Sequence, residues 1–353
     1  MLSPLVLGIE TSCDDTACAV LDGEGRILSS VVSSQLASHR PYGGVVPEIA
    51  SREHLSNWPA VSAEAFARAG VALSAVEVVA ATRGPGLVGA LLVGLALGKS
   101  IALALGRPFL GVHHLEGHLY SPFLAPQSAT APAAEVPERF VGLVVSGGHT
   151  SLFAVDAGRI ETLGETRDDA MGEVFDKVGK RLGLPYPQGP LVDQLAERGD
   201  PAARRFSTPR SGDTLDVSYS GLKSQALLEI EKLERTLGAI DLGAPDTEPP
   251  QPVLDLLAGF RAATVAQLID RLDRLADRQE IPLLAVSGGV AANRLLRREL
   301  PAWAERRGVD LRLVPLEWSG DNAAMIAHAA LLRHRRGQAD DPFQAEAASR
   351  IPL

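Results

Sequence analysis

The chain has 353 residues, a formal net charge of −9 and an apolar share of 46%. This length favours two domains or two lobes, and the composition is that of a soluble protein with a large core. The negative charge argues against a surface dominated by nucleic-acid contacts, although it leaves room for a local basic patch. The only two cysteines, Cys13 and Cys18, indicate no disulfide framework and no cysteine-based zinc site, so we expect a reducing, cytoplasmic environment.

The hydropathy pattern argues against export and membrane insertion. The N-terminal stretch MLSPLVLGIE has no basic region and enters a strand pattern at once, so we expect no signal peptide. The longest apolar run, 86–106, is interrupted by Lys99 after thirteen uncharged residues, too few to span a bilayer. A helix buried against a sheet is the better interpretation of this run.

An internal repeat organises the chain. Residues 6–22 and 140–156 align when one is shifted by 134 positions, which places Gly8 on Gly142 and Ser12 on Ser146. Each copy reads as an apolar strand, a turn of small or polar residues and a second strand, and a further turn and a third strand follow. We therefore expect a duplicated α/β architecture in two similar lobes.

Strand and helix patterns alternate after each copy. In the first half, the patterns predict helices near 48–69 and 87–104 and strands near 76–82 and 109–112. In the second half they predict helices near 171–182, 221–236, 253–279, 290–307 and 322–336, and strands near 282–287 and 311–314. We expect residues 1–124 to form the first lobe, with a C-terminal helix in 322–353 packing back on it, and 125–321 to form the second.

Three Gly-rich or small-residue turns suit an anionic ligand. TSCDDT and SGGHT close the first hairpin of each copy, and AVSGGVAANRLL reads as strand, Gly-Gly and helix. Successive backbone N–H groups at such turns and at a helix N-terminus bind phosphate, although tight turns alone would also explain the glycines. The combination resembles the actin/hexokinase-type nucleotide-binding fold. In that fold Ser146, Gly147 and Gly148 would form one phosphate hairpin, and Glu10 to Asp14, including Ser12, the other.

The stretch GVHHLEGHLY contains a candidate metal site. His114 and His118 are four residues apart, so on a helix both imidazoles face the same side. Glu116 lies about 200° around the helix from His114, away from the position of a metalloprotease base. Asp321 is a candidate third ligand, although its expected place at the N-cap of the last helix would explain it equally. Two imidazoles and a carboxylate suit Fe(II) and Zn(II) alike, and histidines on a polar helix face remain the alternative.

Nine motifs in order give a specific resemblance. They are GIETSCDDT, GGVVPEIASREH, GPGLVGALLVG, HHLEGH, VSGGHT, GEVFDKVGKRLGLPYPQGP, YSGLKS, SGGVAANRLLR and SGDNAAMIA. Over roughly residues 5–335 the chain resembles the tRNA threonylcarbamoyladenosine transferase family, formerly labelled O-sialoglycoprotein endopeptidase. One departure is Gln188, which stands where the family commonly has glycine and puts a close contact at this position in doubt.

The resemblance implies the actin/hexokinase-like (ASKHA) fold and an acyltransferase activity. The threonylcarbamoyl group would pass from threonylcarbamoyl-adenylate to the exocyclic amine of the adenosine beside the anticodon, in tRNAs that read codons beginning with A, with release of AMP. His114, His118 and Asp321 match the metal ligands, for Fe(2+) first and Zn(2+) as the alternative. The residues that match substrate contacts are Val144, Val145, Ser146, Gly147, Gly148, Asp176, Gly189, Asp193 and Asn293.

The same resemblance implies partners and a mechanism without a covalent nucleophile. The donor is already activated, so positioning and charge stabilisation suffice, with the metal as Lewis acid. The family works with tRNA, with a smaller paralogue of the same fold (TsaB) and with an ATPase (TsaE). We expect helices 48–69 and 87–104 to dock the paralogue, and basic clusters at 177–181, 204–205 and 294–298 to offer a strip for tRNA. Membrane association is not expected.

Three other interpretations compete with this one, and the complete set of candidate ligands argues against the first of them, a non-catalytic scaffold. A glycoprotein-cleaving metalloprotease would need a general base beside the histidine pair and export of the chain. A small-molecule kinase of the same fold would bind magnesium through its nucleotide rather than through paired histidines. The histidine spacing and the N-terminus therefore favour the transferase.

Overall fold

The computed structural model describes residues 4–126, 132–208, 212–244 and 247–353. The chain forms two compact units, one of residues 1–137 with 314–353 and the other of residues 138–313. The sequence patterns place these boundaries after residues 124 and 321 instead. Asp321 consequently belongs to the first unit, together with the two candidate histidine ligands.

Each unit is built on a five-stranded mixed sheet. In the first, the strand order is β3-β2-β1-β4-β5. In the second, it is β8-β7-β6-β9-β10, which is the same order in chain sequence. The first-sheet strands are β1 Val6–Glu10, β2 Asp15–Leu21, β3 Ile27–Ser34, β4 Val78–Gly84 and β5 Phe109–His113. The second-sheet strands are β6 Arg139–Val145, β7 Thr150–Asp156, β8 Arg159–Glu165, β9 Leu283–Ser287 and β10 Asp310–Leu313.

The strand register confirms the internal repeat. In β1 and β2, Val6 pairs with Leu21, and in β6 and β7, Phe140 pairs with Val155, each 134 residues later. In both units the first strand also pairs in parallel with the fourth, β1 with β4 and β6 with β9. This duplicated β-β-β-α-β-α-β arrangement is the ASKHA-type fold expected from the sequence.

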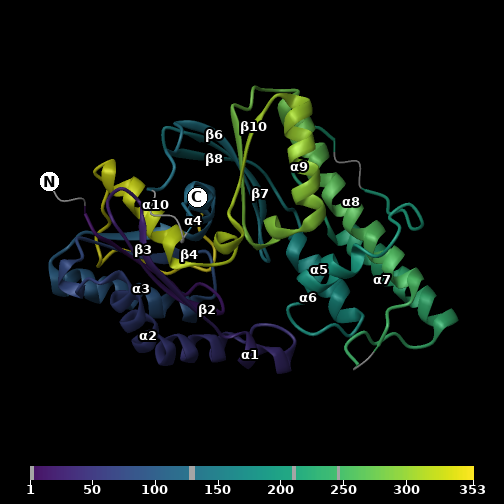
Figure 1. The fold of residues 1–353 in the computed structure, drawn as a ribbon, viewed down its shortest axis with the longest axis horizontal. Helices are drawn as coiled ribbons and strands as arrows, with labels where there is room; N and C mark the ends of the chain where they lie inside the picture. Colours follow the sequence, from purple (N-terminus) through teal and green to yellow (C-terminus); the bar gives the residue numbers. More distant parts are fainter. Residues whose placement is uncertain (1–3, 127–131, 209–211, 245–246) are drawn as a thin grey trace. The chain divides into compact units, whose positions relative to one another are not determined.

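Helices cover the first sheet. They are α1 Leu36–His39, α2 Pro47–Ala69, α3 Val88–Leu105, α4 His114–Tyr120 and α10 Ala323–Arg335. One apolar cluster joins Leu7 and Ile9 of β1 to Val61 of α2 and Leu95 of α3. The last helix, α10 (yellow), contacts β1 and α4 (Figure 1). The C-terminal helix thus packs on the first unit as expected.

Helix α10 matches the helix predicted near 322–336 and covers only the first part of the C-terminal segment 322–353 that was expected on the first lobe. It ends at Arg335, and the chain then turns back to β5, where Asp340 forms a β-bridge with Phe109. The Asp340 carboxylate also accepts hydrogen bonds from Arg333 and from the backbone N–H of Gly111. These contacts, and Pro342 beyond them, hold the terminal residues in an irregular segment rather than a helix.

The helices of the second unit are α5 Met171–Arg181, α6 Gln188–Ala196, α7 Ser220–Leu237, α8 Gln251–Ala276 and α9 Arg294–Arg307. The sequence patterns predicted four of these helices and missed α6. The helix expected over 290–307 is divided, with a 3-10 turn at Gly289–Ala292 before α9. Asn293 causes this division, because its side chain caps α9 by accepting from the N–H of Leu296 at 3.0 Å.

In the part of the chain that the structure describes, two helices, α3 and α8, are long and apolar enough to cross a membrane by length and composition alone. Helix α8 is mostly buried within its unit, and α3 packs against β4. Core helices of a soluble protein pass the same test, and the expectation of a helix packed on the sheet at 86–106 is confirmed.

Candidate metal centre and nucleotide pocket

Two histidines and one aspartate form a buried cluster in the first unit. The candidate ligand atoms of His114, His118 and Asp321 all lie within 4.8 Å of one another. Nε2 of His118 is 3.2 Å, and Nε2 of His114 is 3.5 Å, from the same oxygen, Oδ1 of Asp321. The two imidazole rings are nearly perpendicular, at 87°, and both Nε2 atoms lie beside this one oxygen. This donor set fits a divalent metal ion such as Fe(II) or Zn(II).

The three histidines of residues 113–118 have different roles. His113 ends β5, and its Nδ1 accepts a hydrogen bond from the N–H of Leu115, which caps α4. Burial lowers the pKa of His113 to about 4, so the ring is neutral and can act as this acceptor. His114 and His118 begin and continue α4 on one face. The spacing alone therefore identified the two candidate ligands, and the structure explains the third histidine as a cap.

Asp321 does not cap the last helix. The N-cap of α10 is Asn322, whose side chain accepts from the N–H of Met325 at 2.9 Å. Asn322 also donates to the carbonyl of Gly320, which fixes the turn before the helix. Because the neighbouring asparagine performs the capping, the Asp321 carboxylate is turned toward the histidines instead. The capping alternative for Asp321 is therefore wrong.

Glu10 supports the cluster from behind His114. Its side chain is fully buried, and its Oε2 lies 3.2 Å from Nδ1 of His114, while Thr82 donates to it at 2.6 Å. A proton held on Nδ1 by a carboxylate leaves Nε2 as the lone-pair donor, the arrangement that orients histidine ligands in metal sites. Glu10 was expected in a phosphate hairpin, whereas the structure places it in this buried network.

The electrostatics of the cluster favour a positive charge at its centre. Burial opposes ionisation of His114, yet the carboxylates of Asp321 and Glu10 raise its pKa to about 9. Burial likewise opposes ionisation of Glu10, yet His114 holds the pKa of this carboxyl below its ordinary value. For His118 the effect of burial is larger than that of its hydrogen bond with Asp321, so its pKa is lowered. Two carboxylates around buried imidazoles are the surroundings that a divalent cation satisfies.

No acid is placed as a protease base among the described residues of this cluster. Glu116 is buried, burial raises its pKa, and the cations that act on it are Arg333 and Arg336. The expected orientation of Glu116 away from the ligand face is consistent with these neighbours.

The other two residues expected in the first phosphate hairpin lie near the cluster. Ser12 approaches Nδ1 of His114 with its Oγ at 3.2 Å, and Asp14 is half-buried in the following turn.

A pocket of about 400 Å³ lies in the second unit. Five of the expected substrate residues line it, namely Gly147, Asp176, Gly189, Asp193 and Asn293. Phe175, Pro187, Pro190 and Val290 supply apolar walls, and Arg294 supplies a cation. A pocket of this size with apolar walls and a few polar groups suits a nucleotide-sized ligand.

Two glycines shape the wall beside the SGG turn. A Cβ on Gly172, at the start of α5, would lie 2.7 Å from the carbonyl oxygen of Ser146 and 2.8 Å from Cα of Gly147. Gly288 has φ of +92°, and a Cβ there would lie 2.3 Å from the carbonyl oxygen of Val145. Only glycine allows α5 and the β9 turn to approach the hairpin so closely. Gly172 is a pocket residue that the sequence patterns did not reveal, although it opens the GEVFDK motif.

Four of the expected contacts have other surroundings. Val144 and Val145 are buried within β6, and Ser146 closes the hairpin by accepting from His149 N–H with its Oγ at 3.1 Å. Gly148 lies in this turn, where an added Cβ would meet no atom within 4 Å. Among the described residues, only Gly147 of the VVSGG stretch lines the pocket.

Asp176 links the pocket to the missed helix α6. Its Oδ1 accepts from the N–H of Gly189 at 2.7 Å, at the first turn of α6, where a carboxylate is favourable. Burial raises the pKa of Asp176, and backbone hydrogen bonds from Gly189 and Gln188 oppose this rise. The side chain of Gln188 points away from the pocket, against Gly179, and is buried. The departure at position 188 thus changes the packing of α6 on α5 rather than the pocket lining.

Asp193 is held by three groups. Its Oδ1 accepts from Nδ2 of Asn293 at 2.8 Å and from Nη1 of Arg261 at 3.1 Å, and its Oδ2 accepts from the N–H of Arg294 at 3.1 Å. Arg261 on α8 was not considered from the sequence. No spacing signal connects it to Asp193, because the two lie on separate helices of the second unit.

Four of the eight cations in the expected basic strip form ion pairs with carboxylates. Lys177 pairs with Asp169 and Glu173, and Arg181 pairs with Glu234. Arg204 pairs with Glu229 and Arg298 with Glu197. These clusters therefore present less net charge than the sequence suggested.

Comparison with known proteins gives a consistent result. Residues 26–328 match the family described as tRNA N6-adenosine threonylcarbamoyltransferase. Relatives of this name from Pelobacter propionicus and Anaeromyxobacter dehalogenans are each 49% identical, over 92% and 95% of this chain and 90% and 96% of theirs. HypF of T. kodakarensis aligns with a TM-score of 0.61 at 15% identity, over 95% of this chain and 48% of HypF, which supports the shared fold alone.

The fold, the ordered motifs and the relatives agree on one assignment. The duplicated sheet register supports the fold class, and the family match over most of the chain, together with relatives named as transferases, distinguishes this family within it. This chain belongs to the tRNA N6-adenosine threonylcarbamoyltransferase family, whose members are enzymes that modify adenosine in tRNA.

Proposed function

We propose that this chain transfers the threonylcarbamoyl group of threonylcarbamoyl-adenylate to the exocyclic amine of the adenosine beside the anticodon. The acceptors are tRNAs that read codons beginning with A, and AMP is the leaving group. The observation that carries the proposal is the buried cluster of His114, His118 and Asp321, with ligand atoms within 4.8 Å of one another. Three protein ligands leave positions open for substrate oxygens.

The resident ion in this proposal is iron(II), with zinc(II) as the alternative that the same donors accept. When bound, the ion would supply Lewis-acid polarisation of the acyl carbonyl. His114 and His118 offer Nε2, and Asp321 offers a carboxylate oxygen. Glu10 keeps the proton of His114 on Nδ1, so that Nε2 faces the cluster.

The pocket of the second unit is proposed to bind the adenylate part of the donor. The SGG turn offers backbone N–H groups to phosphate, and Phe175 and Val290 offer apolar surface to adenine. Asp176 and Asp193 are the candidate acceptors for ribose hydroxyls. Holding AMP in place positions the leaving group of an already activated donor, so no Ser, Cys or Lys nucleophile is required.

The metalloprotease alternative lacks support at the same cluster. A general base must reach a metal-bound water on the open side of the ligands. Glu10 faces Nδ1 of His114, which is the opposite side of the ring from Nε2, and Glu116 lies near Arg333 and Arg336. Metal-assisted group transfer needs no such base at this position.

Partner proteins are part of the proposal. Exposed apolar side chains gather on the two helices expected to dock the paralogue. Leu55 on α2 is 61% exposed, and Val88 and Leu92 on α3 are 44% and 53% exposed. Val88 and Leu92 are four residues apart and share one helix face. We propose that this face binds a TsaB-type paralogue, that a TsaE-type ATPase joins the assembly, and that the protein works in the cytoplasm.

The docking face can be tested by placing charge on it. Leu92→Glu should reduce co-purification with the paralogue, since it puts a carboxylate into an apolar interface. Leu228→Glu is the matched control, because Leu228 is 55% exposed on α7 of the other unit. Complex formation by Leu92→Glu equal to that of the control would contradict the docking proposal.

The transferase proposal is tested by nucleoside mass spectrometry of tRNA from cells depleted of this protein. Threonylcarbamoyladenosine should disappear, and return with the wild type but not with His114→Ala/His118→Ala. His334→Ala is the control, since His334 lies in the last turn of α10 outside the cluster. Persistence of the modified nucleoside after full depletion would rule out this activity. Elemental analysis of the purified variants checks separately whether the cluster holds a metal.

A further inference from the structure

A buried arginine lies behind one wall of the nucleotide pocket. Arg261 belongs to α8 and is 5% exposed. Among the described residues, those that line the pocket do not include it. Removing a guanidinium from water is unfavourable unless good hydrogen bonds compensate, so its partners indicate what it serves.

Those partners converge on Asp193 and the end of α6. Nη1 of Arg261 donates to the carbonyl oxygen of Asp193 at 3.0 Å and to its carboxylate Oδ1 at 3.1 Å. Nη2 donates to the carbonyl of Ala196 at 3.2 Å, and Nη1 also contacts Glu197. One guanidinium therefore fixes both the backbone and the side chain of Asp193.

Asp193 in turn bonds to two residues of the pocket wall. Its carboxylate accepts from Nδ2 of Asn293 at 2.8 Å and from the N–H of Arg294 at 3.1 Å. Asn293 and Arg294 both line the pocket and begin α9. A continuous series of hydrogen bonds thus runs from α8 through α6 to the residues that would face a nucleotide.

We infer that Arg261 is a positioning residue for the nucleotide donor. By holding the Asp193 carboxylate in one rotamer, it holds Asn293 and the N-terminus of α9 in the geometry that binds the adenosine monophosphate moiety. The inference rests on the proposed use of this pocket. Asp193 is 8% exposed, so without Arg261 its carboxylate loses a charged partner and gains little water in exchange.

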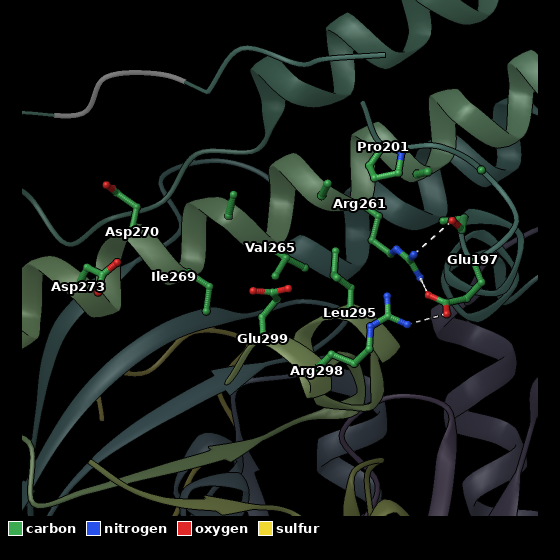
Figure 2. A pocket seen from close by; sticks show the side chains of 15 residues that line it. Glu197, Pro201, Arg261, Val265, Ile269, Asp270, Asp273, Leu295, Arg298 and Glu299 are labelled. Atoms are coloured by element: carbon green, nitrogen blue, oxygen red, sulfur yellow. Dashed lines mark hydrogen bonds and ion pairs between the residues drawn. The ribbon is translucent and has the colours of Figure 1, made fainter. Parts of the chain in front are cut away.

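The other side of Arg261 provides a matched control. A separate cavity of about 660 Å³ lies along α8 and α9, and Figure 2 shows Arg261 and Arg298 both directed to Glu197 at one end of it. Arg298 donates to Glu197 at 2.7 Å and makes no hydrogen bond to Asp193 among the described contacts. Replacing Arg298 removes one of the two arginines that contact Glu197 and leaves the hydrogen bond between Arg261 and Asp193 in place.

The test is titration of AMP into the full-length wild type and the variants Arg261→Lys, Arg261→Met and Arg298→Met. Lysine keeps the charge but has a single nitrogen on a differently shaped side chain, so it cannot bond to Asp193 and to the carbonyl of Ala196 as the guanidinium fork does. We expect Arg261→Lys to bind AMP about tenfold more weakly, the effect of losing one charged hydrogen bond. Arg261→Met should lose more, and Arg298→Met should bind as the wild type does.

Two further measurements separate positioning from a merely structural role. In the tRNA modification assay, Arg261→Lys should raise KM for the donor about tenfold and leave kcat unchanged. Thermal unfolding gives the folded fraction of each variant at the assay temperature. AMP binding by Arg261→Lys that falls only in proportion to its folded fraction would overturn the inference.

The outcomes also separate this inference from the proposed function. Wild type that binds AMP, together with Arg261 variants that bind it equally well, would overturn the positioning role alone. Wild type that binds no AMP would remove the pocket as the donor site, and the inference would fall with it.

Discussion

The ends of β1 and β6 are the same place in the two copies of the repeat, but they have different surroundings. The shift of 134 residues places Glu10, Ser12 and Asp14 on Val144, Ser146 and Gly148. In the first unit, a buried carboxylate at this strand end bonds to Thr82 and His114. In the second, the strand ends in valines and a glycine turn that lines a pocket.

In the proposed function, this difference lets one strand scaffold serve two chemical purposes. A polar strand end can orient a histidine, whereas a glycine turn after the strand leaves backbone N–H groups free to face a phosphate. The surrounding helices follow the same division. In the first unit, β5 continues directly into α4, which carries the histidines. In the second unit, α5 and α6, which line the pocket, follow β8 in the chain and precede β9. Substitutions near each strand end can test whether metal binding in the first unit and AMP binding in the second are independent of one another.

The largest effect is expected for the third ligand of the metal cluster. Asp321→Ala removes the carboxylate whose oxygen faces both Nε2 atoms. Affinity for Zn(2+) should fall by more than the roughly 10–100-fold typical of losing an outer-sphere partner. Competitive titration with a chelating dye measures this change.

Its control is the neighbouring residue, Asn322→Ala. This variant loses the N-cap of α10 and about 1 kcal/mol of stability, but it keeps the cluster. Loss of metal from Asn322→Ala and not from Asp321→Ala would reverse the two roles assigned to these residues.

The next effect is expected for Glu10→Gln. An amide in place of Oε2 presents its N–H₂ to Nδ1 of His114, which favours the tautomer that carries its proton on Nε2. Zn(2+) affinity should fall about 10–100-fold, with AMP binding unchanged. Ser12→Ala, which removes only the Oγ contact to the same nitrogen, should fall less. Equal affinity of Glu10→Gln and wild type would show that the ring is oriented without Glu10.

The corresponding change in the second unit is Gly172→Ala. The added methyl group would meet Ser146 and Gly147 and displace the SGG turn. We expect AMP affinity to fall about tenfold, a loss of about 1.4 kcal/mol, while metal content stays constant. Gly221→Ala is the control, because no atom lies within 4 Å of its Cβ position, and it should bind AMP normally. Unchanged AMP affinity in Gly172→Ala would place the ligand away from this turn.

The smallest effect on binding is expected for Gln188→Gly. The Gln188 side chain packs on Gly179 and does not line the pocket. Glycine at the start of α6 should lower the free energy of unfolding by about 1 kcal/mol or more, from lost helix propensity and lost packing. AMP affinity should stay within about twofold of the wild type, because no pocket-lining side chain is changed. A large gain or loss of AMP affinity would place this side chain at the ligand after all.

Local patterns predicted much of the site because their partners are close in sequence. His114 and His118 were found from helical spacing, and the SGG turn from its position between two strands. Helix α6 was missed because nine residues beginning with Gln-Gly-Pro carry few helical signals. The role of Asp321 was left open, because capping and ligation both require a carboxylate before a helix.

The sequence by itself determined the duplicated sheets, the histidine pair and the family, since these depend on periodicity and on motifs that are contiguous in the chain. Only the tertiary structure decided that Asn322 caps α10 while Asp321 faces the histidines, and that Glu10 lies behind His114. It also decided that Arg261 holds Asp193. The partners that meet in these side-chain contacts are tens to hundreds of residues apart, apart from the local cap. The packing of helices on each sheet, rather than any sequence spacing, brings them within hydrogen-bond distance.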